Sequence, residues 1–206
     1  MKIGVLGGTF DPIHVGHLVI AEEVRVRLGL SRVLFVPARI SPLKLARPLT
    51  AAEDRLRMLE LAVASNPYFQ VSRLDVDRPG PSYSVDTLRE LRSQIGTETQ
   101  VFFIVGADAL VDLPNWRQPR SIIELCQVVG VSRPGFEGFD PATLDPLIPG
   151  ASRKILLLDV PEIGISASAI RARISLGLSI RYLVPEAVER YIYEHALYDT
   201  RTAAEG

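Results

Sequence analysis

Two glycines, a threonine and two histidines lie close together near the start of the chain, in residues 7–17, GGTFDPIHVGH. A short apolar run precedes them, so the segment is predicted to join a strand to a helix. Gly7 and Gly8 lack Cβ atoms, so backbone N–H groups can approach an anion closely, and the helix N-terminus adds partial positive charge. His14 and His17 are three residues apart, which predicts that both lie on one helical face. This pattern favours neutralisation of phosphoryl oxygens over redox or metal chemistry.

Two alternatives compete with this interpretation. A dinucleotide-binding site of the Rossmann type requires G-x-G-x-x-G and an acidic residue about 20 positions later. The glycines here have a different spacing, and the next apolar run, residues 33–36, leads into Pro37. The other alternative is that the histidines only cap or pack a helix. Two histidines beside a glycine turn favour a functional role.

The composition limits the class of protein. With 206 residues and a net charge of −1, the chain is long enough for one buried domain, predicted over residues 1–199, and has no basic footprint for nucleic acid. Residues 200–206 are expected to fray. No apolar run approaches bilayer length, so we expect no membrane partner and a soluble, cytoplasmic protein. Cys126 lies in an apolar stretch, which indicates core packing. His195 has no partner pattern and is assigned a structural role, and a homo-oligomer is left open.

The order of apolar runs predicts an α/β fold. Short runs rich in β-branched residues, typical of buried parallel strands, lie at residues 3–6, 33–36, 69–71, 101–105, 128–131 and 155–158. Helical spacing is found at residues 18–28, 51–64, 84–91 and 185–193. Thr50 and either Ser82 or Ser84 are expected as N-caps. Alternation of this kind predicts a Rossmann-like, doubly wound parallel sheet with helices on both faces. Residues 132–152 break the rhythm and are expected to form a flap with one short helix at 142–147.

Ligands of such sheets collect at the carboxyl ends of the strands, so the residues after each run are the candidates for a site. After the second run, prolines could fix Lys44 as a point charge near phosphates, although a solvated surface lysine is the alternative. After the third, the turn at residues 80–88 leads into a helix whose free N–H groups suit a carboxylate or phosphate. Without further information, an ordinary capped helix with Tyr83 in the core is the simpler interpretation of that turn.

Several of these segments resemble one family. Residues 7–17 resemble the (T/S)-x-G-H signature of the nucleotidylyltransferase superfamily, and the longer form GGTFDPIHxGH is similar to that of the nicotinate-nucleotide adenylyltransferases. Further segments resemble the same family in the same order: GPSYSVDTL at 80–88, GAD at 106–108 with the following tryptophan, RPG at 133–135 and ISASAIR at 165–171. The chain departs from the family at Leu43, where those enzymes usually have a histidine before the lysine.

The resemblance implies adenylyl transfer from ATP to nicotinate mononucleotide, which gives nicotinate adenine dinucleotide and pyrophosphate. It implies Mg²⁺ bridging the phosphates mostly through water, and we assign no metal ligand to the protein. The implied catalytic residues are His14, His17, Lys44 and Arg171. The implied ATP-binding residues are Gly7, Gly8, Thr9, Gly106, Asp108, Arg133, Ser166 and Ser168. The implied acceptor-binding residues are Ser82, Tyr83, Ser84, Thr87 and Trp116, with the tryptophan stacked on the pyridine ring.

The acceptor and the activity have alternatives. Other adenylyltransferases of the superfamily use nicotinamide mononucleotide or pantetheine phosphate, and a non-catalytic nucleotide-binding sensor would share the phosphate turn. The segments at 80–88 and 106–116 favour a pyridine nucleotide, and the presence of both histidines argues against a sensor. The N–H groups at the helix entry predict a preference for the acid over the amide, because a neutral carboxamide would turn its NH₂ toward donors.

Overall fold

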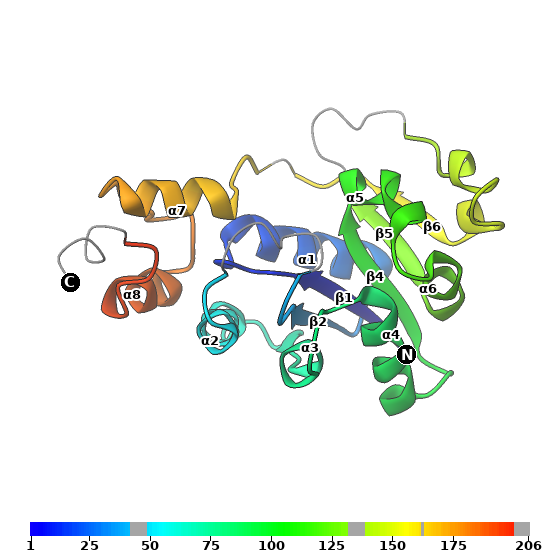
Figure 1. The fold of residues 1–206 in the computed structure, drawn as a ribbon, viewed down its shortest axis with the longest axis horizontal. Helices are drawn as coiled ribbons and strands as arrows, with labels where there is room; N and C mark the ends of the chain where they lie inside the picture. Colours follow the sequence, from blue (N-terminus) through cyan, green and yellow to red (C-terminus); the bar gives the residue numbers. More distant parts are fainter. Residues whose placement is uncertain (42–48, 132–138, 162, 200–206) are drawn as a thin grey trace.

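A fully parallel, six-stranded sheet forms the centre of the computed structural model (Figure 1), which describes residues 1–41, 49–131, 139–161 and 163–199. Its strands are β1 (Lys2–Gly8), β2 (Arg32–Pro37), β3 (Phe69–Val71), β4 (Gln100–Gly106), β5 (Gln127–Val131) and β6 (Ile155–Leu158). They lie in the order β3-β2-β1-β4-β5-β6, and every neighbouring pair is parallel. All six predicted strands and the parallel sheet are confirmed.

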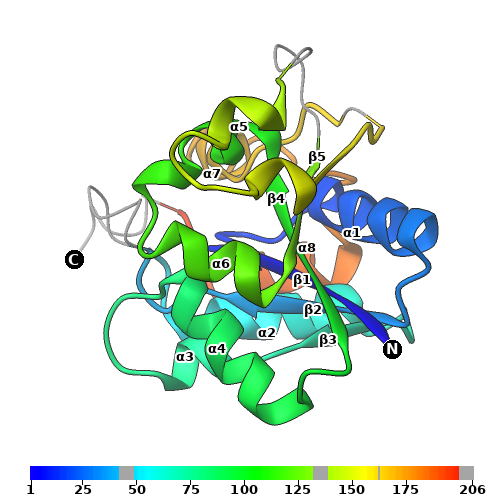
Figure 2. The same cartoon turned by 90° about the vertical axis from the view of Figure 1, so that its right-hand side faces the viewer.

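The two faces of the sheet bury different side chains. In β2, Val33 and Phe35 belong to one apolar cluster, whereas Leu34 and Val36 belong to the other, as the period of two in a strand requires. The first cluster packs under α1 (Val15–Leu28), α2 (Ala52–Val63), α7 (Ala167–Ser175) and α8 (Glu186–Glu194). The second packs under α4 (Ser84–Ile95) and α6 (Pro119–Leu125). Figure 2 shows α1 and α6 on opposite sides of β1 and β4. The doubly wound fold is therefore confirmed.

Some helices differ from their predicted bounds. Helix α1 begins at Val15, three residues earlier than predicted, because His14 already acts as the N-cap. Three short helices, α3 (Leu74–Asp77), α5 (Ala107–Val111) and α6, were not predicted, since four to seven residues carry too little periodicity to detect. The helix predicted at 142–147 is a 3₁₀ turn at Pro141–Leu144. In the described ranges no helix is both long and apolar enough to cross a membrane.

The predicted N-caps of α2 and α4 are wrong. The residues at these positions are Ala51 and Tyr83, and neither caps its helix through a side chain. The hydroxyl of Ser82 instead accepts a hydrogen bond from the Arg39 N–H at 2.9 Å, which ties the turn before α4 to the segment after β2. Thr50 contributes its carbonyl oxygen, which accepts from the Nε of Arg55 at 2.9 Å. Both residues connect loops at the carboxyl edge of the sheet.

The single cysteine has the structural role that its sequence context predicts. Cys126 is 3% exposed, and its thiol donates to the carbonyl oxygen of Ile122 at 3.2 Å. Burial raises the pKa of this thiol to about 12, so it stays protonated at neutral pH. Core packing is therefore confirmed for Cys126.

Candidate functional site

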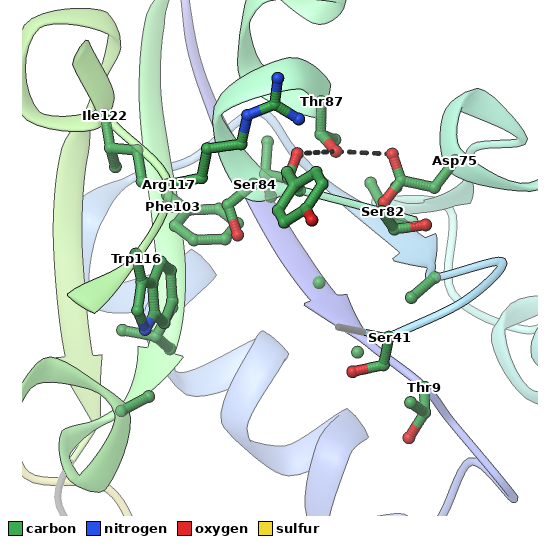
Figure 3. A pocket seen from close by; sticks show the side chains of 18 of the residues that line it. Thr9, Ser41, Asp75, Ser82, Ser84, Thr87, Phe103, Trp116, Arg117 and Ile122 are labelled. Carbon is green, nitrogen blue, oxygen red and sulfur yellow. Dashed lines mark hydrogen bonds between the residues drawn. The ribbon is translucent and has the colours of Figure 1, made fainter. Parts of the chain in front are cut away.

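A cavity of about 470 Å³ opens at the carboxyl edge of the sheet, beside β1 and β4 (Figure 3). This is where the strand order changes direction, since β1 lies between β2 and β4 and the loops after them diverge. The predicted site residues that line the cavity are Gly7, Gly8, Thr9, Ser82, Tyr83, Ser84, Thr87, Gly106, Asp108 and Trp116. The cavity therefore brings together the turn after β1, the entry of α4 and the segment after β4.

The turn after β1 is closely packed and strained. A Cβ atom on Gly8 would lie 3.1 Å from the ring of Phe10. Any other residue at this position would therefore require the Phe10 ring to move. Phe10 itself is buried and has a φ of 48°, a left-handed conformation that bulky residues rarely adopt. Strained backbone of this kind persists where the surrounding structure fixes it, commonly at functional sites. The turn is thus held in one shape beside the cavity.

The two histidines lie at the start of α1, but only one of them is helical. His14 is the N-cap, with an extended φ of −144°, so the prediction that both lie on one helical face is wrong. The rings nevertheless lie together, with centroids 3.7 Å apart, because the Nδ1 of His17 accepts from the His14 N–H at 3.3 Å. A Cβ atom on Gly16 would lie 3.1 Å from the His14 ring, so this glycine makes room for the pair.

Three further predicted phosphate-binding residues, Ser166, Ser168 and Arg171, lie on α7 or at its N-cap. Ser166 caps this helix, since its hydroxyl accepts from the Ala169 N–H at 3.2 Å. The hydroxyl of Ser168 is 3.2 Å from that of Ser166. Arg171 donates to the carbonyl oxygen of Asp11 and so joins α7 to the turn after β1. These residues do not line the cavity itself. Among them, Arg171 contacts the turn after β1, whose residue Thr9 lines the cavity.

A buried arginine that the sequence analysis did not single out holds this edge together. Arg55 on α2 is 1% exposed, and its guanidinium donates to the carbonyl oxygens of Thr9 at 2.8 Å, Ala38 at 2.7 Å and Arg39 at 3.1 Å. Burial lowers the pKa of this guanidinium, and the nearby negative charge of Asp11 acts in the opposite direction. One side chain therefore connects the loops after β1 and β2, and Thr9 and Ala38 both line the cavity.

The sequence does carry a signal for this burial. Arg55 precedes Leu59 and Ala62 by four and seven residues, and both of these are core residues. An arginine on the apolar face of an amphipathic helix is buried only when its donors are satisfied. Asp11 and Tyr198 carry no comparable signal. The Tyr198 hydroxyl donates to the buried Asp11 carboxylate at 2.8 Å, across 187 positions of sequence.

A second buried network supports the entry of α4. Asp75 is 6% exposed, and its carboxylate accepts from the Thr87 hydroxyl at 2.5 Å and from the guanidinium of Arg78. Burial raises the pKa of the Asp75 carboxyl, whereas these hydrogen bonds act to lower it. Arg78 also donates to Glu90 at 2.8 Å. The Thr87 hydroxyl is thus engaged within the protein, and we assign it to holding the turn.

Aromatic side chains line the opposite wall of the cavity. Trp116 is half-buried and meets the ring of Phe103 edge to face, at a centroid distance of 6.3 Å and an interplanar angle of 79°. Its indole nitrogen is buried and has no hydrogen-bond partner in the described part of the chain. Arg117, which follows it, lies over the ring of Tyr83, with Cζ 4.6 Å from the centroid. This wall offers aromatic surface and a cation.

Three of the discussed positions, Leu43, Lys44 and Arg133, lie outside the described residues, as does the predicted frayed tail at 200–206. Within the described ranges, no three His, Cys, Asp or Glu side chains gather as a metal-binding group. The carboxylates that line the cavity are those of Asp75 and Asp108.

Comparison with known proteins gives both family and fold. A family model described as cytidylyltransferase-like matches residues 5–173. A protein of Roseiflexus sp. named as a probable nicotinate-nucleotide adenylyltransferase is 49% identical over 196 residues, which are 95% of this chain and 97% of that protein. A protein of Dehalococcoides mccartyi with the same name is 44% identical over 198 residues, 96% of this chain and 97% of that protein.

The fold is shared with solved structures of distant sequence. The Plasmodium falciparum nicotinic acid mononucleotide adenylyltransferase complexed with NaAD has a TM-score of 0.78 at 18% identity, over 96% of this chain and 97% of that one. A putative nicotinate-nucleotide adenylyltransferase from Vibrio parahaemolyticus has a TM-score of 0.63 at 16% identity, over 93% of this chain and 98% of that one. At these identities the likeness establishes the arrangement of the sheet and its helices.

Proposed function

The chain belongs to the nicotinate-nucleotide adenylyltransferase family of cytidylyltransferase-like proteins, and we propose from this and from its cavity that it transfers the adenylyl group of ATP to nicotinate mononucleotide. The products are nicotinate adenine dinucleotide and pyrophosphate. Curated relatives that span nearly the whole chain carry the name of this activity, and the solved P. falciparum enzyme of the same fold is described in complex with NaAD.

The observation that carries the proposal is the composition of the cavity described above. One end is formed by the glycine turn Gly7–Thr9, which leads to the N-terminus of α1 and is joined to α7 through Arg171, and is suited to phosphates. The other end is formed by Trp116, Tyr83 and the entry of α4, and is suited to a flat ring with a polar substituent. A dinucleotide spans such a cavity, with its phosphates at the turn.

The chemistry needs positioning and charge neutralisation more than an enzyme nucleophile. A phosphate oxygen of the acceptor attacks the α-phosphorus of ATP, and the bond from that phosphorus to the oxygen bridging the β-phosphate breaks as pyrophosphate leaves. The acceptor phosphate is already ionised at neutral pH, so no strong base is required. Mg²⁺, bound with ATP, would supply further positive charge on the phosphates.

We assign the following roles on this basis. His14 and His17 hold the α-phosphate, Thr9 orients it, and Lys44 and Arg171 neutralise the departing pyrophosphate. Gly106, Asp108 and Arg133 bind the adenosine, while the α7 entry at Ser166 and Ser168 faces the outer phosphates of ATP. Ser82, Tyr83 and Ser84 bind the acceptor, with Thr87 behind them.

The acceptor preference follows from the helix entry. The first N–H groups of α4, those of Ser84 and Val85, have no intrahelical carbonyl partner and suit a carboxylate. Because charge-assisted hydrogen bonds are about twice as strong as neutral ones, we expect the acid to be preferred over the amide by at least about tenfold in kcat/KM. Competition kinetics with nicotinate and nicotinamide mononucleotides at equal concentration test this. A preference for the amide would overturn the acceptor assignment and leave adenylyl transfer intact.

Replacement of Trp116 by alanine should weaken both acceptors alike. Stacking on an aromatic ring contributes roughly 1–3 kcal/mol per base, so the KM for either mononucleotide should rise about tenfold or more, with the acid-to-amide ratio unchanged. Tyr68→Ala is a matched control, because this exposed aromatic precedes β3 at the opposite edge of the sheet. A Trp116→Ala enzyme that loses one acceptor selectively would contradict the stacking role.

A further inference from the structure

Arg117 is the only cationic side chain among the described residues that line the cavity. The other charged residues there are the acids Asp75 and Asp108. Arg78 forms an ion pair with Asp75 and also donates hydrogen bonds to Thr87 and Glu90. Arg78 does not line the cavity. Among the described residues, Arg117 is therefore the side-chain cation that an anionic group in the cavity can meet.

The position of Arg117 places its charge at the ring end of the cavity. It directly follows Trp116, and its Cζ lies 4.6 Å from the centroid of the Tyr83 ring. Figure 3 shows its side chain extending from the segment of Trp116 toward the helix that carries Ser84 and Thr87. The guanidinium thus lies close to the entry of α4. The first N–H groups of that helix carry partial positive charge, so they and the guanidinium would attract the same anion.

The guanidinium is free to turn toward a ligand. Its side chain is 50% exposed, and its ion pair with Asp86 is long, with Nη1 and Oδ2 3.4 Å apart. Normal hydrogen bonds between nitrogen and oxygen lie at 2.7–3.2 Å, so this contact holds it weakly. Asp86 also lies 3.8 Å from Arg89, which can take over as its partner. A carboxylate that approaches can therefore recruit Arg117 without leaving Asp86 isolated.

We infer that Arg117 is the residue that selects the acid: its guanidinium binds the ring carboxylate of nicotinate mononucleotide, in concert with the amides at the entry of α4. The inference rests on the proposed function and names the side chain that sets its acceptor specificity. A planar guanidinium matches a carboxylate with two parallel hydrogen bonds, whereas a carboxamide offers it one acceptor and an opposing NH₂. Without Arg117, the negative charge of Asp86 would disfavour the acid further.

The test compares Arg117→Gln, Arg117→Lys and the wild type with both mononucleotides. Arg117→Gln should lower the acid-to-amide ratio of kcat/KM about tenfold, equivalent to ~1.4 kcal/mol, with little change for the amide. Arg117→Lys should give an intermediate ratio, because lysine keeps the positive charge but cannot form two parallel hydrogen bonds to a carboxylate. Arg120→Gln is the matched control, since it removes the same charge from an exposed position on α6 outside the cavity.

Binding can be read without turnover, because Trp116 is the only tryptophan of the chain and lines the cavity. Titration of its fluorescence should show the acid losing affinity in Arg117→Gln and the amide keeping it. An acid-to-amide ratio of kcat/KM that is unchanged in Arg117→Gln would overturn the inference, and so would an equal fall of that ratio in Arg120→Gln. In either case, a wild type that makes the dinucleotide would still support the proposed function. A wild type that makes no dinucleotide from either mononucleotide would overturn both.

Discussion

Replacement of His17 by alanine should reduce kcat by roughly 10²–10³-fold while ATP still binds, because its imidazole meets charge that grows mainly in the transition state. The structure fixes the ring for this task. Its Nδ1 accepts from the His14 N–H at 3.3 Å, which fixes the orientation of the imidazole at the start of α1. Phe10 packs edge to face against it, with ring centroids 5.1 Å apart.

Steady-state kinetics and ATP binding on the same preparation separate the two effects, with circular dichroism as the check on folding. His195→Ala is the matched control, because this histidine ends α8 and stacks on Tyr191 at a centroid distance of 4.0 Å. It should keep normal turnover. A His17→Ala enzyme with near-normal kcat would remove that histidine from the mechanism.

Replacement of Arg55 by methionine should lower kcat/KM about 100-fold or more, although Arg55 does not line the cavity. Its guanidinium bonds the carbonyls of Thr9, Ala38, Arg39 and Thr50, and no apolar side chain can replace those donors. Misplacement of reacting groups by about 1 Å can cost 10²-fold in rate. Each buried carbonyl left without a donor also costs roughly 1–3 kcal/mol, so the free energy of unfolding should fall.

The measurement must separate positioning from stability. Met58→Ala, on the same helix and fully buried, should cost about 2–5 kcal/mol of unfolding free energy and leave kcat/KM close to wild type at a temperature where the protein is folded. Urea unfolding and kinetics are run on both variants. Arg55→Lys, which keeps the charge, should regain part of the rate. If Met58→Ala loses as much activity as Arg55→Met, the role of Arg55 is structural only.

The sheet was predictable because its inner strands, β1, β2, β4 and β5, are buried over most of their length and therefore appear as apolar runs. β3 has only three residues and was still found, since it is bounded by polar turns. Helices α3 and α5 were not found, because four or five residues carry too little periodicity. The cap of α4 was assigned to a serine from local chemistry, whereas the Ser82 hydroxyl bonds Arg39 across 43 positions.

The same distinction applies to the site. Glycines and histidines in one short segment were recognisable because their spacing is local, and the cavity does bring the turn after β1 next to the segments of Tyr83 and Trp116. Arg55 and Asp11 act through partners far away in sequence, at Ala38 and Tyr198, so nothing near them indicates their contacts. Residues that line the cavity are thus easier to predict than residues that hold the loops around it in place.

The most direct measurement follows the α-phosphate of ATP. The protein is incubated with Mg²⁺, nicotinate mononucleotide and ATP labelled at the α-phosphorus, and the products are separated by chromatography. The account predicts that the label appears in nicotinate adenine dinucleotide, with one pyrophosphate released per dinucleotide, and that His17→Ala forms product far more slowly. Label recovered only as ATP or AMP, or an equal yield from His17→Ala, would contradict it.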